Sequence, residues 1–547
     1  MNIIEKIKQN KKTVIIFLLI LTAGILLRTY QFHNWMRFSV DQVRDAGIVS
    51  AALENKEPLP LLGPKAGTTT FKLGSIYYHF SYFSAKVFGN YPDKMAYPSL
   101  FSAILAIPLM YFLARKYFSK KVALSIMAVM SFSYLLVISS RFSSNPNVVP
   151  FFLLLYLYSM LELLDGQNKR SYFWSVLVGL ALGVSVQLHT TLLVIMPLMT
   201  LGILGFLLKD KRVGVFKNFF IIFVVALFFN ISQLNYEINN DWANSKIFLA
   251  SLSSKSKTET SLFEKVYLVS TCQLQANSYM ISSLIPDVEI KNNSDNATCN
   301  HIFQNPKGGL DKKLAYYSNI FASVLFSVFG YGLFYRRFKK ERDKSKQSFL
   351  GLLLLFQFLA FVVFVPVAEM LHTGYFNILF PVPLVMFGLL VEFVLVKFKK
   401  KGKIIVLVLL TLLLLSSLAK SYQLALRYMD GKENNSRNVT LGEIERMSKY
   451  VLSNSAGNSK VYFSGQKDLV DRYYKTINYF AEEAGLDMTF LKSENIANGK
   501  AEIRKGVPIF YIQKNGHEKN DPGEIRQGRE IVSSQIFSNQ TMLILKN

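Results

Sequence analysis

Apolar residues recur along the 547-residue chain in blocks of about 20 residues, the length that crosses the hydrocarbon core of a bilayer as an α-helix. Polar segments separate these blocks, so each block predicts one membrane-spanning helix. The blocks lie at about residues 13–27, 95–114, 122–139, 148–164, 172–186, 191–208, 218–234, 314–335, 348–368, 376–396 and 403–418. The pattern therefore predicts an all-α polytopic membrane protein with about eleven transmembrane helices.

Basic residues are distributed unevenly among the loops between these blocks. About 26 basic and about 5 acidic residues fall in the N-terminal segment and in the loops around residues 115–121, 169–170, 209–217, 336–346 and 397–403. The positive-inside rule makes this set of loops cytoplasmic, and the alternate loops then face outward. The net charge of +26 thus reflects topology and gives no reason to expect a nucleic-acid partner. We expect a multi-pass plasma-membrane protein with a cytoplasmic N-terminus and an extracytoplasmic C-terminal domain.

The long polar segments divide the chain into two domains. Residues 1–419 form the predicted transmembrane domain, with large outer loops at 28–94 and 235–313. Both cysteines, Cys272 and Cys299, lie in the second loop. On an oxidising face they are candidates for one disulfide, with two free thiols or an incomplete metal site as the alternatives.

The remaining residues, 420–547, change character. Short runs of β-branched and aromatic residues at 460–464, 507–512 and 531–545 predict strands, and residues 468–484 predict a helix. This segment is expected to form a small α/β domain on the outer face. We interpret it as a lid or scaffold.

A charged heptapeptide follows the first apolar block. It reads Ser39-Val40-Asp41-Gln42-Val43-Arg44-Asp45, so two carboxylates flank an arginine just beyond the predicted membrane exit. Beside a bilayer, Arg44 can meet a lipid-borne phosphate while Asp41 or Asp45 takes a proton. The alternative is a solvated helix start, with Ser39 as N-cap and the aspartates as surface charges.

Other polar side chains recur at the same predicted membrane face. They are Arg141, Gln187, His189, Glu369, His372 and Tyr375. Each has a structural alternative: Arg141 as a headgroup anchor, His189 bonded to a backbone carbonyl, and Tyr375 as part of an aromatic belt. Taken together, however, guanidinium, carboxylate and imidazole groups are the inventory for holding a phosphate and removing a proton.

Four motifs resemble the GT-C class of integral-membrane glycosyltransferases, in the branch of the protein O-mannosyltransferases and the aminoarabinose transferase of lipid A. Residues 41–45 resemble the acidic motif after the first span, although Gln42 replaces the usual second acid. Residues 74–78 (Gly-Ser-Ile-Tyr-Tyr) resemble a Pro-Pro-Leu-Tyr-Tyr run, with Lys72 near the place of a phosphate-contacting lysine. Residues 87–100 resemble a Leu-Phe-Gly…Arg-Leu-Pro-Ser segment, with Ala96 in place of the arginine, and residues 372–383 resemble a late His/Arg-Tyr…Pro helix start.

The resemblance implies an inverting transfer of a sugar from a polyprenyl-phosphate carrier to an acceptor at the outer face. Asp41 would be the general base, and Asp45 would orient Arg44 or bind a divalent cation. The phosphate of the donor would be held by Arg44, Lys72 and Arg141. The pocket would be shaped by Tyr77, Tyr78, Gln187, His189, His372 and Tyr375.

Two other classes are alternatives. A polymerase or ligase of lipid-linked glycans would share this hydropathy but would not depend on Asp41. A transporter or flippase would show inverted repeats and charged residues near mid-bilayer. Under the glycosyltransferase interpretation, the partners are a lipid-linked sugar donor, membrane lipids, and an acceptor that is a glycan, a lipid or a protein. The only cofactor left open is a divalent cation.

Overall fold

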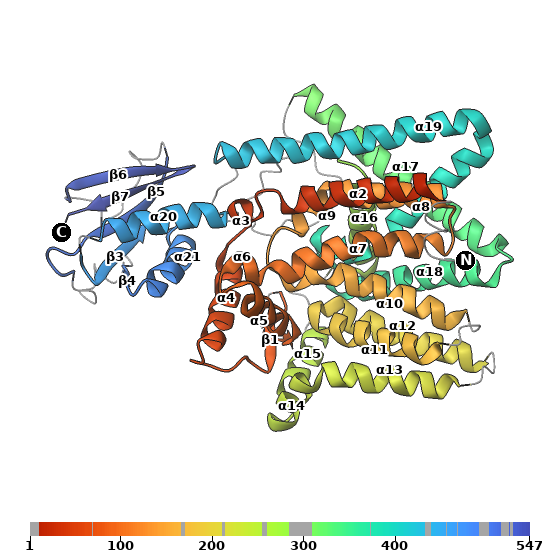
Figure 1. Cartoon of the computed structure of the whole chain (residues 1–547), viewed down its shortest axis with the longest axis horizontal. Helices are drawn as coiled ribbons and strands as arrows, with labels where there is room; N and C mark the ends of the chain where they lie inside the picture. Colours follow the sequence, from red (N-terminus) through yellow and green to blue (C-terminus); the bar gives the residue numbers. More distant parts are fainter. Residues whose placement is uncertain are drawn as a thin grey trace.

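The computed structural model describes residues 10–67, 69–165, 170–209, 214–253, 260–283, 309–371, 373–432, 439–455, 457–467, 469–491, 503–515, 525 and 529–546. These residues form an elongated bundle of helices with a small sheet domain at one end (Figure 1). The long helices of the bundle are α2 (Lys11–Thr29), α7 (Tyr97–Arg115), α8 (Lys120–Phe132), α10 (Val149–Leu164), α11 (Ser171–Leu188), α12 (Thr190–Lys209), α13 (Val215–Phe229), α17 (Leu310–Lys340), α18 (Lys344–Phe364) and α19 (Pro381–Met429).

Within the described residues, eight helices are long and apolar enough to cross a membrane, or nine if one bent pair counts as a single span. The predicted all-α membrane fold is therefore confirmed, but eleven separate spans are not. Helix α19 includes two predicted spans, 376–396 and 403–418. The chain turns between them at Lys399, whose φ is +45°. The predicted span 122–139 is broken at Ser133 into α8 and the short α9 (Tyr134–Ser139). The bent pair joins α13 to α14 (Ile231–Asn239) at 68°.

Short elements fill the segments between the long helices. The first large loop, residues 28–94, contains α3 (Phe32–Trp35), α4 (Val40–Leu53), the hairpin β1 (Leu62–Lys65) and β2 (Lys72–Gly74), α5 (Ile76–Phe88) and α6 (Pro92–Met95). The second large loop contributes α15 (Ala243–Ser253) and α16 (Leu262–Ile281), and α16 packs against α17 and α19. Three 3-10 segments complete this part, namely η1 (Asn145–Val148), η3 (Val365–Met370) and η4 (Thr373–Leu379).

The C-terminal domain is a five-stranded mixed sheet with two helices. The strand order is β4-β3-β5-β7-β6, with β3 parallel to β4 and β5, and β7 antiparallel to β5 and β6. Its elements are α20 (Leu441–Ser453), β3 (Lys460–Gly465), α21 (Val470–Glu483), β4 (Asp487–Phe490), β5 (Ile509–Lys514), β6 (Ile531–Phe537) and β7 (Gln540–Leu545). The small α/β domain predicted from the sequence is therefore present, with α20 and β4 as elements that the pattern did not reveal.

This domain is fastened to the first large loop by backbone bonds and apolar packing. The amide of Phe38 donates to the carbonyl of Val439 at 2.9 Å, and the amide of Leu441 donates to the carbonyl of Met36 at 2.8 Å. Buried side chains from both sides then share one core, as Phe38 meets Tyr479 and Phe480. The chain leading into α4 is thus held from the domain side, which sets the position of the charged heptapeptide.

Candidate active site

A cavity of about 430 Å³ opens beside the start of α4. Its walls come from the end of α2, the turn after β1, the segment between α9 and η1, the junction of α11 with α12, and η4. Much of its lining is apolar, including Met130, Leu136 and Phe380. The polar side chains that line it include Arg28, Asp41, Lys65, Asn145, Asn147, His189, Tyr375 and Asn377.

The cavity lies where helices are interrupted. Helix α11 ends at His189, whose backbone is extended, and α12 starts at the next residue. The imidazole Nδ1 of His189 accepts a hydrogen bond from the backbone amide of Thr191 at 3.1 Å. The side-chain amide of Asn145 donates to the carbonyl of Leu188 at 2.9 Å. These side chains satisfy backbone groups that the break leaves unpaired, as buried helix ends require. The rings of His189 and Tyr375 are nearly perpendicular, with their centroids 5.8 Å apart.

Helix α4 begins with a capping box. The hydroxyl and amide of Ser39 both donate to Oε1 of Gln42, at 2.6 and 3.2 Å, and Nε2 of Gln42 donates to the carbonyl of Ser143 at 2.9 Å. Gln42 therefore connects α4 to the cavity wall. This connection needs an N–H donor, which an ionised carboxylate at the same position would lack. The capped first turn holds Asp41 at the cavity, with its side chain 72% exposed.

Asp45 lies one turn further along α4 in a different environment. Its side chain is only 10% exposed, and its Oδ1 accepts bonds from Nε and Nη2 of Arg44 at 2.9 and 2.8 Å and from the hydroxyl of Tyr78 at 3.0 Å. Burial raises the pKa of Asp45 to about 6, against the opposing effect of Arg44. Nη1 of Arg44 also contacts Asp41 at 3.1 Å, so one guanidinium joins both carboxylates.

None of the three predicted phosphate ligands is among the described lining residues of the cavity: Arg44 contacts the lining residue Asp41, and the other two lie elsewhere. Arg141 is buried, and its guanidinium donates to the carbonyls of Leu27, Arg28 and Tyr30 at 3.2, 3.0 and 2.7 Å, which closes the end of α2. The backbone of Lys72 pairs with Asn244, and its side chain is exposed. Lys65, which faces Lys72 across the β1–β2 hairpin, lines the cavity instead.

Two of the predicted pocket tyrosines, Tyr77 and Tyr78, lie in the first turn of α5, and Gln187 contacts the start of that helix. Tyr77 is buried, and its hydroxyl forms a hydrogen bond with Ser143. The hydroxyl of Tyr78 donates to Asp45. Gln187 donates to the carbonyls of Gly183 and Phe229 and accepts from the amide of Ile76 at 3.3 Å. A Cβ at Gly74 would come within 2.2 Å of Oε1 of Gln187, so this close approach needs glycine where the resembled motif has proline.

The cavity was only partly foreseen from the sequence. Asp41, His189 and Tyr375 line it together, whereas Arg28, Lys65 and the asparagines were missed as lining residues. The turn after β1 approaches Tyr375 at Gly67, where φ is +57° and a Cβ would lie 3.3 Å from the tyrosine hydroxyl. A lysine directly before an Ala-Gly turn was the available signal for Lys65.

Three predicted residues are absent from the cavity lining described above. His372 and Cys299 lie outside the described residues, while Cys272 is buried in α16. The disulfide therefore stays a prediction. Among the residues that the structure describes, no three His, Cys, Asp or Glu side chains are grouped to hold a metal ion.

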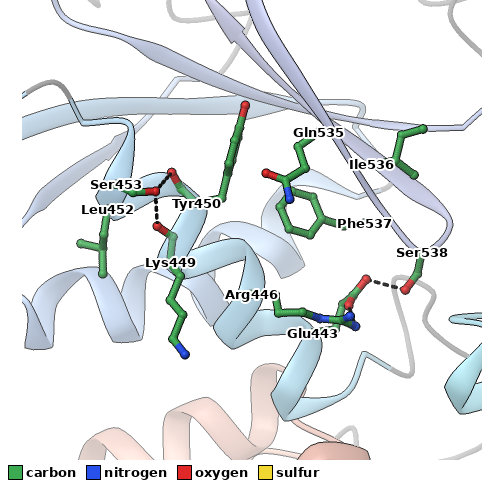
Figure 2. Close-up of a pocket in the computed structure, with 10 residues that line it drawn as sticks. All are labelled: Glu443, Arg446, Lys449, Tyr450, Leu452, Ser453, Gln535, Ile536, Phe537 and Ser538. Carbon is green, nitrogen blue, oxygen red and sulfur yellow. Dashed lines mark hydrogen bonds and ion pairs between the residues drawn. The ribbon is translucent and has the colours of Figure 1, made fainter.

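A second, wider depression of about 780 Å³ lies on the C-terminal domain between α20 and β6 (Figure 2). Two cations line it, Arg446 and Lys449; Arg446 is paired with the buried Glu443, which also accepts a bond from Ser538. Tyr450 bonds to Ser533 and packs against Phe537. These groups complete the contacts of the domain, so the smaller cavity beside α4 is the better candidate site.

Comparisons with known proteins bear on the family and the fold. Residues 76–234, less than a third of the chain, match the model of the family described as dolichyl-phosphate-mannose-protein mannosyltransferase. No curated protein sequence matches the chain. The crystal structure of ArnT from Cupriavidus metallidurans bound to undecaprenyl phosphate is similar over 98% of both chains, with a TM-score of 0.53 at 11% identity. The apo oligosaccharyltransferase of Archaeoglobus fulgidus is similar over 92% of this chain and 69% of its own, with a TM-score of 0.52 at 13% identity.

The fold is similar to that of the GT-C membrane transferases, and the family match over residues 76–234 indicates a glycosyltransferase. The resemblance drawn from the sequence motifs is thus confirmed, including its relation to the mannosyltransferase and aminoarabinose transferase branch.

Proposed function

We propose that the protein transfers a sugar from a polyprenyl-phosphate carrier to an acceptor at the outer membrane face, with inversion at the anomeric carbon. Asp41 is the general base. The observation that carries the proposal is that an exposed carboxylate, Asp41, shares one cavity with the cations Arg28 and Lys65. The ArnT structure of the same fold holds undecaprenyl phosphate, which supports a polyprenyl-phosphate donor here.

The proposed step is a single displacement. The acceptor oxygen bonds to the anomeric carbon while its proton passes to the carboxylate of Asp41. The bond from the anomeric carbon to the phosphate oxygen breaks, and the polyprenyl phosphate leaves with the electron pair. Arg44 contacts Asp41 at 3.1 Å, so a positive charge stands beside the carboxylate.

The other predicted roles remain proposals. Of the three predicted phosphate ligands, Arg44 stays a candidate because it contacts Asp41, whereas Lys72 and Arg141 do not line the cavity. Asp45 orients Arg44 or binds a divalent cation. His189, His372 and Tyr375 shape the pocket together with Tyr77, Tyr78 and Gln187. The short bonds from Arg44 to Asp45 support the orienting role, because they fix the guanidinium that also reaches Asp41.

The proposed orientation follows from charge. The loops rich in lysine and arginine are cytoplasmic, so the N-terminus lies inside, and the cavity and the C-terminal domain lie outside. A lipid-linked donor suits that location because it reaches the site within the membrane plane. The acceptor is a glycan, a lipid or a protein.

The test uses purified protein in nanodiscs with a panel of radiolabelled polyprenyl-phosphate sugars, and it follows loss of label from the lipid. Wild type is expected to release or transfer sugar from one donor, and Asp41→Asn is expected to fail. Asp471→Asn is the matched control, since Asp471 is an exposed first-turn aspartate of α21 outside the cavity lining. Equal turnover by Asp41→Asn would remove Asp41 from the mechanism and direct attention to Asp45.

A further inference from the structure

Arg28 is a charged side chain buried inside the apolar bundle. It lies in the last turn of α2 and is 1% exposed. Its Nη1 donates to the carbonyls of Gly24 and Ser131 at 3.0 and 2.8 Å, and its Nη2 donates to that of Met130 at 3.2 Å. Two of these carbonyls belong to the end of α8, next to the break at Ser133. Arg28 therefore satisfies backbone groups that the broken helix leaves open.

This capping role does not account for the charge. Carbonyls need hydrogen-bond donors, which a neutral amide supplies equally well, whereas a buried guanidinium is costly unless an anion accompanies it. Among the described residues, no carboxylate forms an ion pair with Arg28, and its Nε has no hydrogen-bond partner. Nε and Nη2 form the edge with which arginine binds phosphates and carboxylates in pairs of bonds.

The same side chain lines the cavity beside α4. We infer that Arg28, together with Lys65, forms the anion site of this cavity and binds the phosphate group of the lipid-linked donor. The identity of the ligand rests on the proposed function. Lys65 supplies the second charge from the end of β1, and no ion pair of Lys65 with another described residue is present.

The charge and lining of the cavity fit this ligand. A glycosylated polyprenyl phosphate carries one negative charge, and the polyprenyl phosphate that leaves carries up to two. Two cations therefore interact more strongly with the leaving group than with the bound donor, which is the condition for lowering the barrier. Apolar side chains such as Leu136 and Phe380 line the remaining wall, where they suit a lipid more than a free inorganic ion.

The assignment also separates Arg28 from Arg141. All three bonds of Arg141 go to carbonyls at the end of α2, among them the carbonyl of Arg28 itself. Arg141 thereby positions the turn that carries Arg28, while Arg28 faces the cavity. One arginine holds the backbone and the other is left with an unpaired donor at the site.

The experiment measures equilibrium binding of radiolabelled undecaprenyl phosphate to the full-length protein in detergent, without acceptor. Arg28→Gln keeps amide donors for the carbonyls but removes the charge, and it is expected to weaken binding about 10- to 100-fold, the effect of losing a charge-assisted bond. Lys65→Gln is expected to weaken binding up to about tenfold. Arg337→Gln, which removes a guanidinium from the last turn of α17, outside the cavity lining, is the matched control with unchanged affinity.

Two further arms make the result decisive. Inorganic phosphate is added as a competitor, and it is expected to leave lipid binding unchanged; displacement of the lipid that depends on Arg28 would assign the site to free phosphate instead. Wild-type affinity in both Arg28→Gln and Lys65→Gln would overturn the inference. Because Lys65 is exposed, Lys65→Gln still tests the site if Arg28→Gln does not fold.

A failure of the anion site can be distinguished from a failure of the proposed function, because one is measured as lipid binding and the other as sugar transfer. A wild type that binds the lipid through Arg28 but transfers no sugar from any donor would contradict the proposed function and leave the anion site standing. A wild type that transfers sugar, with normal lipid binding in Arg28→Gln and Lys65→Gln, would contradict only the anion site.

Discussion

Asp41 and Asp45 stand one helical turn apart on α4 and share Arg44, yet their environments are opposite. The side chain of Asp41 is 72% exposed and lines the cavity, whereas that of Asp45 is 10% exposed and is enclosed by Arg44 and Tyr78. The motif alone treats the two carboxylates as near equivalents. The structure assigns one to the cavity and the other to the scaffold that supports it. Residues four apart lie on the same side of a helix, so the difference comes from their position along α4: Asp41 is in the first turn at the cavity, and Asp45 is one turn deeper, against Tyr78.

The largest expected effect that separates the two aspartates is on turnover. Replacing the base in Asp41→Asn removes the proton acceptor, which typically contributes 10² to 10⁴-fold, so we expect sugar transfer to fall by about that factor. Thermal stability should change little because the side chain is exposed. Asp45→Asn, which keeps an oxygen for Tyr78 and Arg44, should lose far less activity. Rates of donor turnover in the two variants measure the contrast, and similar losses would mean that the division of roles is wrong.

The next effect is a dependence of folding stability on pH that arises from the titration of Asp45. Burial raises its pKa to about 6 in the folded protein, above the ordinary value of 3.8. Between these values the folded state keeps a proton that the unfolded state has released, so this stabilisation is complete below about pH 4 and is lost as pH rises through about 6. The loss is on the order of 2–3 kcal/mol.

The measurement is the thermal unfolding midpoint in detergent from pH 4 to 7, taken as the difference between wild type and Asp45→Asn. This difference is expected to shift against wild type as pH rises, because the variant has no proton to lose. Asp41→Asn serves as the control and should keep the wild-type slope. A difference that stays constant with pH would show that Asp45 does not titrate in this range.

The membrane fold was largely predictable from the sequence because apolar blocks of span length allow few alternatives. One of its interruptions was predictable and one was not. The turn at Lys399 falls in the predicted loop at residues 397–403, whose lysines mark a connection between two spans. Ser133 lies within an apolar block with no proline or glycine beside it, so hydropathy gives no sign of the break there. The strands β3 and β5 and the helix α21 were foreseen because their patterns are local.

The candidate site divides in the same way. Asp41 was predicted from a motif next to a membrane exit, and it lines the cavity. Arg28 ends an apolar block, where an arginine usually serves as a membrane anchor, and only the open carbonyls of α8 reveal why it is buried. The sequence resemblance favoured Lys72 over Lys65, whereas the pairing of β1 with β2 decides which lysine faces the cavity.

The smallest effect tests what keeps Asp41 in place. Ser39 caps α4 through Gln42, and Gln42 ties the first turn to Ser143, so the carboxylate stands on a turn held from two directions. Ser39→Ala should cost about 1 kcal/mol of stability and reduce turnover several-fold, because a frayed first turn lets the base leave its position. Ser261→Ala, which removes the N-cap of α16, is the matched control and should lower stability without the loss of turnover. If both variants lose turnover equally, capping acts only through overall stability. If Ser39→Ala alone does, the exposed aspartate depends on a local scaffold even though it makes few contacts of its own.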